Sequence, residues 1–85
     1  MLRTPVGDTR LRILAWLREP DRGERGATAE AVAARFGLPR PVAVTHLRLL
    51  TSLGLLCTAR STGRLHYRRD EVRIAQVARM LEKGW

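Results

Sequence analysis

Hydrophobic residues repeat along this 85-residue chain with two different periods, and the change of period divides the chain into elements. A period of three to four residues, typical of amphipathic helices, occurs in four segments, and a period of two, typical of β-strands, occurs in one. The pattern therefore predicts four helices and one β-hairpin. In chain order these are helices over about 9–19, 28–36 and 39–53, a hairpin over 55–68, and a last helix that begins at 71.

The second and third helices are joined by a very short connection. Thr28 is a good N-cap for the second helix, and Gly37 stands where a residue in the left-handed conformation would end it. Pro39 and Pro41 suit the start of the third helix, where their missing N–H groups have no intrahelical partner. The pattern predicts a helix-turn-helix, in which the second helix braces the third and the third is presented.

The hairpin carries positive charge at its tip. The sequence Ser-Thr-Gly-Arg over 61–64 is typical of a turn, and it places Arg60 and Arg64 close to Gly63. A charged tip of this kind is often only solvated, but beside a helix-turn-helix it completes a winged helix. We therefore expect this wing, residues 60–66, to lie along a phosphate backbone or to enter a minor groove.

The first helix is apolar around more than half of its circumference, which exceeds the stripe that a surface helix of a monomer needs. We expect Leu11, Leu14 and Leu17 to pack within the chain. Ile13 and Trp16 are then left to meet a partner subunit. The alternative is a helix that is buried wholly in its own small core.

The last helix has one apolar stripe. Asp70 is its predicted N-cap, and Ile74, Val77, Ala78 and Leu81 follow at i, i+3, i+4 and i+7. The stripe packs on the domain, on the same helix of a second copy, or on both. We expect a homodimer through the first and last helices, because two-fold dimers are the commonest oligomers. The expected interface residues are Ile13, Trp16, Ile74, Val77 and Leu81.

Composition favours a polyanion as the partner. Lys and Arg number 16 against 8 Asp and Glu, giving a formal net charge of +8 that arginine carries almost alone. The planar fork of arginine pairs bidentately with phosphate and with guanine edges, which suits DNA, although a genomic preference for arginine gives the same composition. The length fits one domain over 1–85, with residues 1–7 as an unstructured lead because of Pro5 and Gly7.

Candidate chemistry is sparse. The single cysteine, Cys57, forms no internal disulfide, and no apolar run reaches the roughly 20 residues that span a bilayer, so we expect a cytoplasmic protein without membrane contact. His46, His66 and Cys57 lack the spacing of zinc ligands, and no nucleophile has a recognisable base partner. We expect no metal, no cofactor and no enzymatic activity. Cys57 is either a small core residue or a thiol sensor.

Three motifs occur in a characteristic order. They are TRLRIL in the first helix, His46-Leu47-x-x-Leu50 followed by Leu53-Gly54-Leu55, and Gly63-Arg64-x-x-Tyr67 in the wing. From about Thr9 to Leu81 the chain thereby resembles the ArsR-type winged helix-turn-helix transcriptional repressors. The resemblance implies a mainly α fold with a small β-hairpin wing, in the order α-α-α-β-β-α. It also implies a homodimer paired through terminal helices, with each presented helix in the major groove of one half-site of double-stranded DNA.

The resemblance further implies which residues contact DNA. It places base-facing residues in the first turns of the presented helix and further contacts later in that helix and in the wing. Arg40 suits guanine O6 and N7, Thr45 suits a thymine methyl or a phosphate, and Val44 departs from the small hydroxyl residue usual in the family. With the hairpin tip and the second helix included, the expected set is Thr28, Arg40, Pro41, Val44, Thr45, Arg48, Arg60 and Arg64.

Metal-responsive members of that family carry Cys-x-Cys in the bracing helix or Asp, His and Glu ligands in the last helices. The matching segment here, AEAVAARF, has neither cysteine nor histidine, so no metal switch is expected. The leading hypothesis is a dimeric, sequence-specific transcriptional regulator that represses by occluding a promoter. The alternative is a winged-helix protein-interaction module, a small accessory or antagonist subunit, which the low polarity around Val44 favours and the nearby arginines disfavour.

Overall fold

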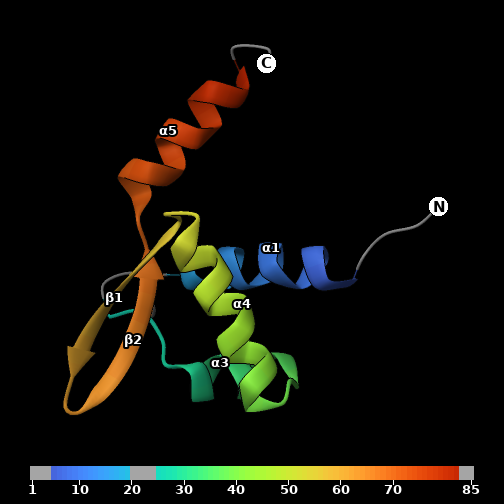
Figure 1. The fold of residues 1–85 in the computed structure, drawn as a ribbon, viewed down its shortest axis with the longest axis vertical. Helices are drawn as coiled ribbons and strands as arrows, with labels where there is room; N and C mark the ends of the chain where they lie inside the picture. Colours follow the sequence, from blue (N-terminus) through green and yellow to red (C-terminus); the bar gives the residue numbers. More distant parts are fainter. Residues whose placement is uncertain (1–4, 20–24, 83–85) are drawn as a thin grey trace.

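The computed structural model describes residues 5–19 and 25–82 of the chain (Figure 1). Its elements are α1 (Pro5–Leu17), α3 (Ala29–Phe36), α4 (Arg40–Ser52), β1 (Leu56–Ser61), β2 (Arg64–Arg69) and α5 (Glu71–Glu82). This order confirms the predicted winged helix-turn-helix with one β-hairpin. Of the predicted domain over 1–85, residues 1–4, 20–24 and 83–85 lie outside the described residues.

Helix α1 is shifted toward the N-terminus relative to the prediction of 9–19. It begins at Pro5, so the expected unstructured lead is wrong for residues 5–7, while residues 1–4 lie outside the described part. Proline is well suited to the first turn of a helix, since its N–H would have no partner there. At the other end, the amides of Arg18 and Glu19 donate to carbonyls three residues earlier, at 3.1 Å each, which closes the helix with a tighter turn.

Helix α3 has both of the predicted caps. The Thr28 hydroxyl oxygen accepts a hydrogen bond from the Ala31 amide at 3.2 Å, and Gly37 adopts the left-handed conformation with φ of 66°. The amides of Gly37 and Leu38 both donate to the Ala33 carbonyl, the latter at 2.9 Å, and together they close the end of the helix. These caps make the turn to α4 short, and they confirm the helix-turn-helix.

The wing is an antiparallel pair whose register runs from Leu56 opposite Arg69 to Ser61 opposite Arg64. The turn that the sequence predicted therefore joins the two strands directly. A further segment, which the sequence did not reveal, pairs with the wing: Ala27 and Tyr67 exchange two backbone hydrogen bonds of 2.9 and 2.8 Å. A single-residue bridge has no periodicity, and this one ties the start of α3 to β2.

The core lies where α1, α3, α4 and the base of the wing meet. Its largest fully buried side chains belong to Ile13, Leu17, Val32 and Leu47. The expected division of α1 holds for Leu14 and Leu17, which pack within the chain. It is wrong for the other three residues: Ile13 and Trp16 are buried inside the chain, while Leu11 is 67% exposed. Trp16 packs edge-to-face on Phe36 of α3, with ring centroids 5.7 Å apart, so α3 takes up the aromatic face that the prediction left for a partner.

Helix α5 leads away from the other elements (Figure 1). Asp70 caps it as predicted, its Oδ1 accepting from the Arg73 amide at 3.1 Å. Ile74 and Val77 are half-buried, and Met80 is 51% exposed. Within the described residues, no helix combines the length and the apolar character needed to cross a membrane.

Arg69 joins the end of the wing to α1, a role that the sequence pattern did not indicate. Its Nη1 donates to the Leu14 carbonyl at 2.8 Å, and its Nε pairs with Glu71 at 2.7 Å. The hydrogen bond from Arg69 lowers the pKa of the Glu71 carboxyl below its usual value. Strand β2 is thus tied to α1 by Arg69 and to the start of α3 by the bridge between Tyr67 and Ala27.

Candidate nucleic-acid interface

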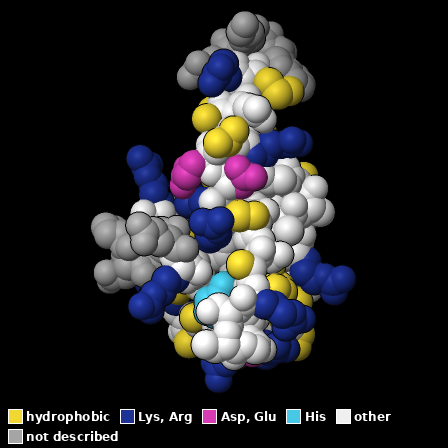
Figure 2. Space-filling model, turned by 90° about the vertical axis from the view of Figure 1, so that its left-hand side faces the viewer, with side chains coloured by type: hydrophobic (Ala, Val, Ile, Leu, Met, Phe, Trp, Pro, Cys, Tyr) yellow, Lys and Arg dark blue, Asp and Glu magenta, His cyan; other side chains and the backbone are white. Residues whose placement is uncertain are grey.

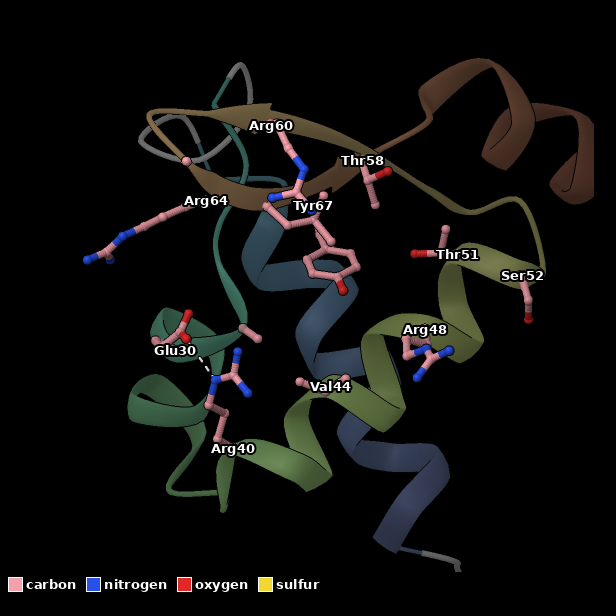
Figure 3. Close-up of a pocket in the computed structure, with 13 residues that line it drawn as sticks. Glu30, Arg40, Val44, Arg48, Thr51, Ser52, Thr58, Arg60, Arg64 and Tyr67 are labelled. Atoms are coloured by element: carbon pink, nitrogen blue, oxygen red, sulfur yellow. Dashed lines mark hydrogen bonds and ion pairs between the residues drawn. The ribbon is translucent and has the colours of Figure 1, made fainter.

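An open groove of about 860 Å³ separates α4 from the inner face of the wing. Figure 3 shows the side chains that line it: those of α4 rise from below, while Arg60 and Tyr67 extend from the wing toward them. Arg40, Val44 and Arg48 lie one helical turn apart, so they share the face of α4 that borders the groove. The whole lining consists of Ala29, Glu30, Arg40, Val44, Arg48, Thr51, Ser52, Thr58, Arg60, Gly63, Arg64, Leu65 and Tyr67.

The structure brings five of the predicted DNA-binding residues together around this groove and leaves three outside its lining. The five are Arg40, Val44, Arg48, Arg60 and Arg64. Of the other three, Thr28 uses its hydroxyl as the α3 cap, and Thr45 donates its hydroxyl proton to the Pro41 carbonyl at 2.9 Å. Pro41 and Thr45 are nevertheless exposed at the start of α4, so a ligand larger than the groove reaches them.

The groove is strongly basic. Arg48, Arg60 and Arg64 are exposed, and none of them forms an ion pair with another described residue. Figure 2 shows Lys and Arg side chains spread over the wing side of the molecule, with acidic side chains mainly near the base of α5. Unpaired guanidinium groups on a concave surface attract and orient a polyanion such as nucleic acid.

One acidic residue enters this basic surface. The Oε2 atom of Glu30 lies 2.7 Å from Nε of Arg40, and both side chains are more than half exposed (Figure 3). The hydrogen bond from Arg40 lowers the pKa of the Glu30 carboxyl, and the nearby charge of Arg64 acts in the same direction. From the sequence, Glu30 indicated only a favourable charge at a helix start, because the ten residues that separate it from Arg40 match no helical or strand spacing.

Several groove residues were missed by sequence reasoning, although some carried a signal. Thr51 and Ser52 follow Arg48 at i+3 and i+4, which places them on the same face of α4. Thr58 precedes Arg60 by two residues and so shares its face of β1. In the sequence, Tyr67 stands out only as part of a family motif; in the structure it is 6% exposed and forms part of the groove wall.

The remaining chemically active side chains lie away from this surface. His46 is 6% exposed and faces the core, and its buried Nδ1 has no partner among the described residues. Burial lowers the pKa of His46 below its ordinary value, and the charge of Arg10 lowers it further. Cys57 is half-buried in β1. Among the residues described, no three His, Cys, Asp or Glu side chains are grouped so as to hold a metal ion.

A helix-turn-helix followed by a β-hairpin, with a basic groove between the presented helix and the hairpin, defines a winged helix-turn-helix protein. Residues 8–57 match the sequence model of a family described as helix-turn-helix domain, and the chain belongs to this family. Its winged fold is of the ArsR type, a class of DNA-binding transcriptional regulators. No curated protein sequence matches the chain.

Three solved structures are similar to the chain at 28% sequence identity. A possible transcriptional regulator for arsenical resistance superposes with a TM-score of 0.75, over 92% of this chain and 76% of its own. An ArsR-like transcriptional regulator from Rhodococcus sp. RHA1 gives a TM-score of 0.72, over 89% and 67%. The antimony-specific transcriptional repressor AntR gives 0.62, over 87% and 64%. The similarity thus covers nearly all of this chain and about two thirds to three quarters of each relative.

Proposed function

We propose that this protein is a dimeric, sequence-specific transcriptional repressor that places α4 in the major groove and the wing on the adjacent backbone or minor groove. The observation that carries the proposal is the groove between α4 and the wing, where Arg48, Arg60 and Arg64 project without ion-pair partners among the described residues. A DNA backbone supplies the negative charge that this surface lacks.

The side chains of α4 suggest separate roles in recognition. The guanidinium of Arg40 lies in the first turn and suits the O6 and N7 acceptors of guanine, and Val44, one turn later, suits the methyl group of thymine. Arg48 and the wing residues Arg60 and Arg64 flank them and are suited to phosphates. Pro41 and Thr45, exposed on the same first turns, add contacts at the groove edge.

Dimerisation is proposed through α5. The half-buried Ile74 and Val77 lie on one face of a helix that extends away from the core, and Leu81 continues that stripe in the sequence. A second copy related by a two-fold axis covers this face and presents a second α4 at the roughly 34–36 Å spacing of successive major grooves. Ile13 and Trp16 have no place in this interface, since both are buried in the protomer.

The test begins with duplexes selected from a randomised DNA library by the purified protein. We expect enrichment of one two-fold symmetric sequence, and weaker binding to it by Arg48→Ala and Arg60→Ala variants. Enrichment of no sequence contradicts the proposal. A stoichiometric protein partner recovered from cells, together with no DNA preference, supports the protein-interaction module instead.

Sedimentation analysis tests the dimer. A Val77→Glu variant places a charge in the α5 stripe, and we expect a monomer with weakened DNA binding. Val72→Glu is the matched control, because Val72 is 71% exposed and lies on the opposite side of the helix. A wild-type monomer, or equal effects of the two substitutions, contradicts pairing through this stripe.

A further inference from the structure

A carboxylate on a surface that binds DNA opposes binding, because it repels the phosphates that the arginines attract. Glu30 is such a group: it lines the groove, is 55% exposed, and lies near both Arg40 and Arg64. Glu30 therefore contributes nothing to general affinity for DNA, and any contribution it makes to DNA binding must be of another kind.

The geometry of the ion pair leaves part of Arg40 available. The carboxylate accepts from Nε at 2.7 Å, and neither terminal nitrogen of Arg40 bonds to a described residue. A guanidinium binds the two acceptors of guanine either end-on, through both terminal nitrogens, or side-on, through Nε and one terminal nitrogen. Because Glu30 engages Nε, the pair favours the end-on mode over the side-on mode.

Glu30 itself stands on a rigid support. It lies in the first turn of α3, between the buried Ala29 and the fully buried Val32. The Thr28 cap and the paired backbone of Ala27 fix the start of that helix. A carboxylate on such an element restricts a flexible arginine more effectively than one on a loop.

We propose that Glu30 is a positioning residue that orients Arg40 for end-on recognition of one guanine, so that it increases sequence specificity while it decreases general affinity for DNA. The inference rests on the proposed function, and it names the part of the site that selects the base. Arg40 touches the base; Glu30 acts through Arg40.

The experiment measures binding of fluorescent duplexes by anisotropy. The probes are the duplex selected by the wild-type protein, single replacements of each G·C pair in its half-site, and an unrelated duplex of equal length. The variants are Glu30→Ala, Glu30→Gln, Arg40→Ala and the double variant Glu30→Ala/Arg40→Ala. Glu71→Gln is the matched control. It removes the negative charge from the Arg69–Glu71 pair, which has the same 2.7 Å separation as the Arg40–Glu30 pair but lies outside the groove lining.

We expect Glu30→Ala to bind the unrelated duplex more tightly than wild type and to lose discrimination at one G·C pair by at least about fivefold, the low end of what a bidentate contact contributes. Arg40→Ala should lose discrimination at the same pair, and the double variant should lose no more than Arg40→Ala alone. Glu30→Gln should fall between Glu30→Ala and wild type, and Glu71→Gln should keep full discrimination.

Two results overturn the inference while leaving the proposed function intact. One is an equal gain in affinity for the selected and unrelated duplexes in Glu30→Ala, which reduces Glu30 to a repulsive charge. The other is a loss of discrimination at a position that Arg40→Ala does not affect. If the wild-type protein selects no duplex at all, the proposed function itself fails, and this inference fails with it.

Discussion

Replacement of Gly26 by alanine tests whether the bridge between the start of α3 and the wing contributes to the fold. Gly26 has φ of 76°, and a Cβ added there overlaps the Tyr67 carbonyl oxygen and lies 2.8 Å from its carbon and 2.9 Å from Cβ of Arg68. Since the obstacle includes backbone, no side-chain rotation relieves it. The chain must instead move away from β2 and weaken the two hydrogen bonds between Ala27 and Tyr67.

The magnitude follows from these two effects. An alanine in the left-handed region costs about 1–2 kcal/mol, and each of the two backbone hydrogen bonds contributes about 1 kcal/mol net. We expect Gly26→Ala to lower the free energy of unfolding by about 3–4 kcal/mol, a large part of the total for a chain of 85 residues.

Gly37→Ala is the matched control, because Gly37 also has positive φ but its Cβ would meet nothing within 4 Å. It should cost only the conformational penalty of about 1–2 kcal/mol. Urea unfolding followed by circular dichroism, at one fixed protein concentration, compares the two variants. The predicted gap between the two variants is about 2 kcal/mol. A gap of less than about 0.5 kcal/mol contradicts a contribution of the bridge to stability.

Three further predictions concern the caps and the core. Thr28→Ala removes the α3 cap, and thermal unfolding should show a loss of stability of about 1 kcal/mol. Thr28→Ser keeps the hydroxyl, so its stability should be nearly that of wild type. Equal losses of stability in the two variants contradict the capping role of Thr28. Leu47→Ala should cost about 2–5 kcal/mol in urea unfolding, since Leu47 is fully buried in the core, and a loss below about 1 kcal/mol indicates a looser core than described. The fold lowers the pKa of His46, so as the pH falls through about 6.5 the imidazole takes up a proton in the unfolded state before it does in the folded state. The free energy of unfolding should therefore decrease as the pH falls from about 6.5 toward the lower pKa of the folded state. Measured between pH 7.5 and 5.5, the free energy of unfolding should fall with pH in wild type and fall less steeply in His46→Gln. Identical pH dependence in the two proteins excludes His46 as the cause.

The sequence predicted the elements well because local chemistry determines them. Thr28, Gly37 and Asp70 are caps whose side chain or backbone freedom acts within a few residues, and all three occupy the predicted positions. The predicted start of α1 was wrong because a proline can either interrupt a helix or occupy its first turn. The residues around Pro5 do not decide between these two roles, and in the structure Pro5 begins the helix.

Packing between elements was predictable only in part. The pattern on α1 showed more apolar surface than one face needs, but it did not indicate which side α3 and α4 would cover. Trp16 packs against Phe36 of α3 and is buried, so the face of α1 that carries Trp16 turns inward and Leu11 is exposed. The hydrophobic pattern of one helix depends on that helix alone, whereas the face that becomes buried depends on side chains of the helices packed against it.

The groove was predictable for residues that share one element and less so for residues that meet only in space. Arg40, Val44 and Arg48 follow from helical spacing, and Arg60 and Arg64 follow from the hairpin tip. The pair of Glu30 with Arg40 and the bridge of Ala27 with Tyr67 join separate elements, so no local pattern contains them.

If the surface formed by α4 and the wing binds a DNA backbone, DNA binding must depend on salt, because the bound arginines release counterions from the phosphates. For wild type, the logarithm of the association constant with the selected duplex should fall linearly as the logarithm of the salt concentration rises. Arg64→Ala should flatten that line by about 0.9 for each phosphate that the variant no longer neutralises. Arg79→Ala, an exposed α5 residue outside the groove lining, should leave the slope unchanged. Binding that is insensitive to salt, or equal slopes for Arg64→Ala and Arg79→Ala, contradicts DNA binding through α4 and the wing.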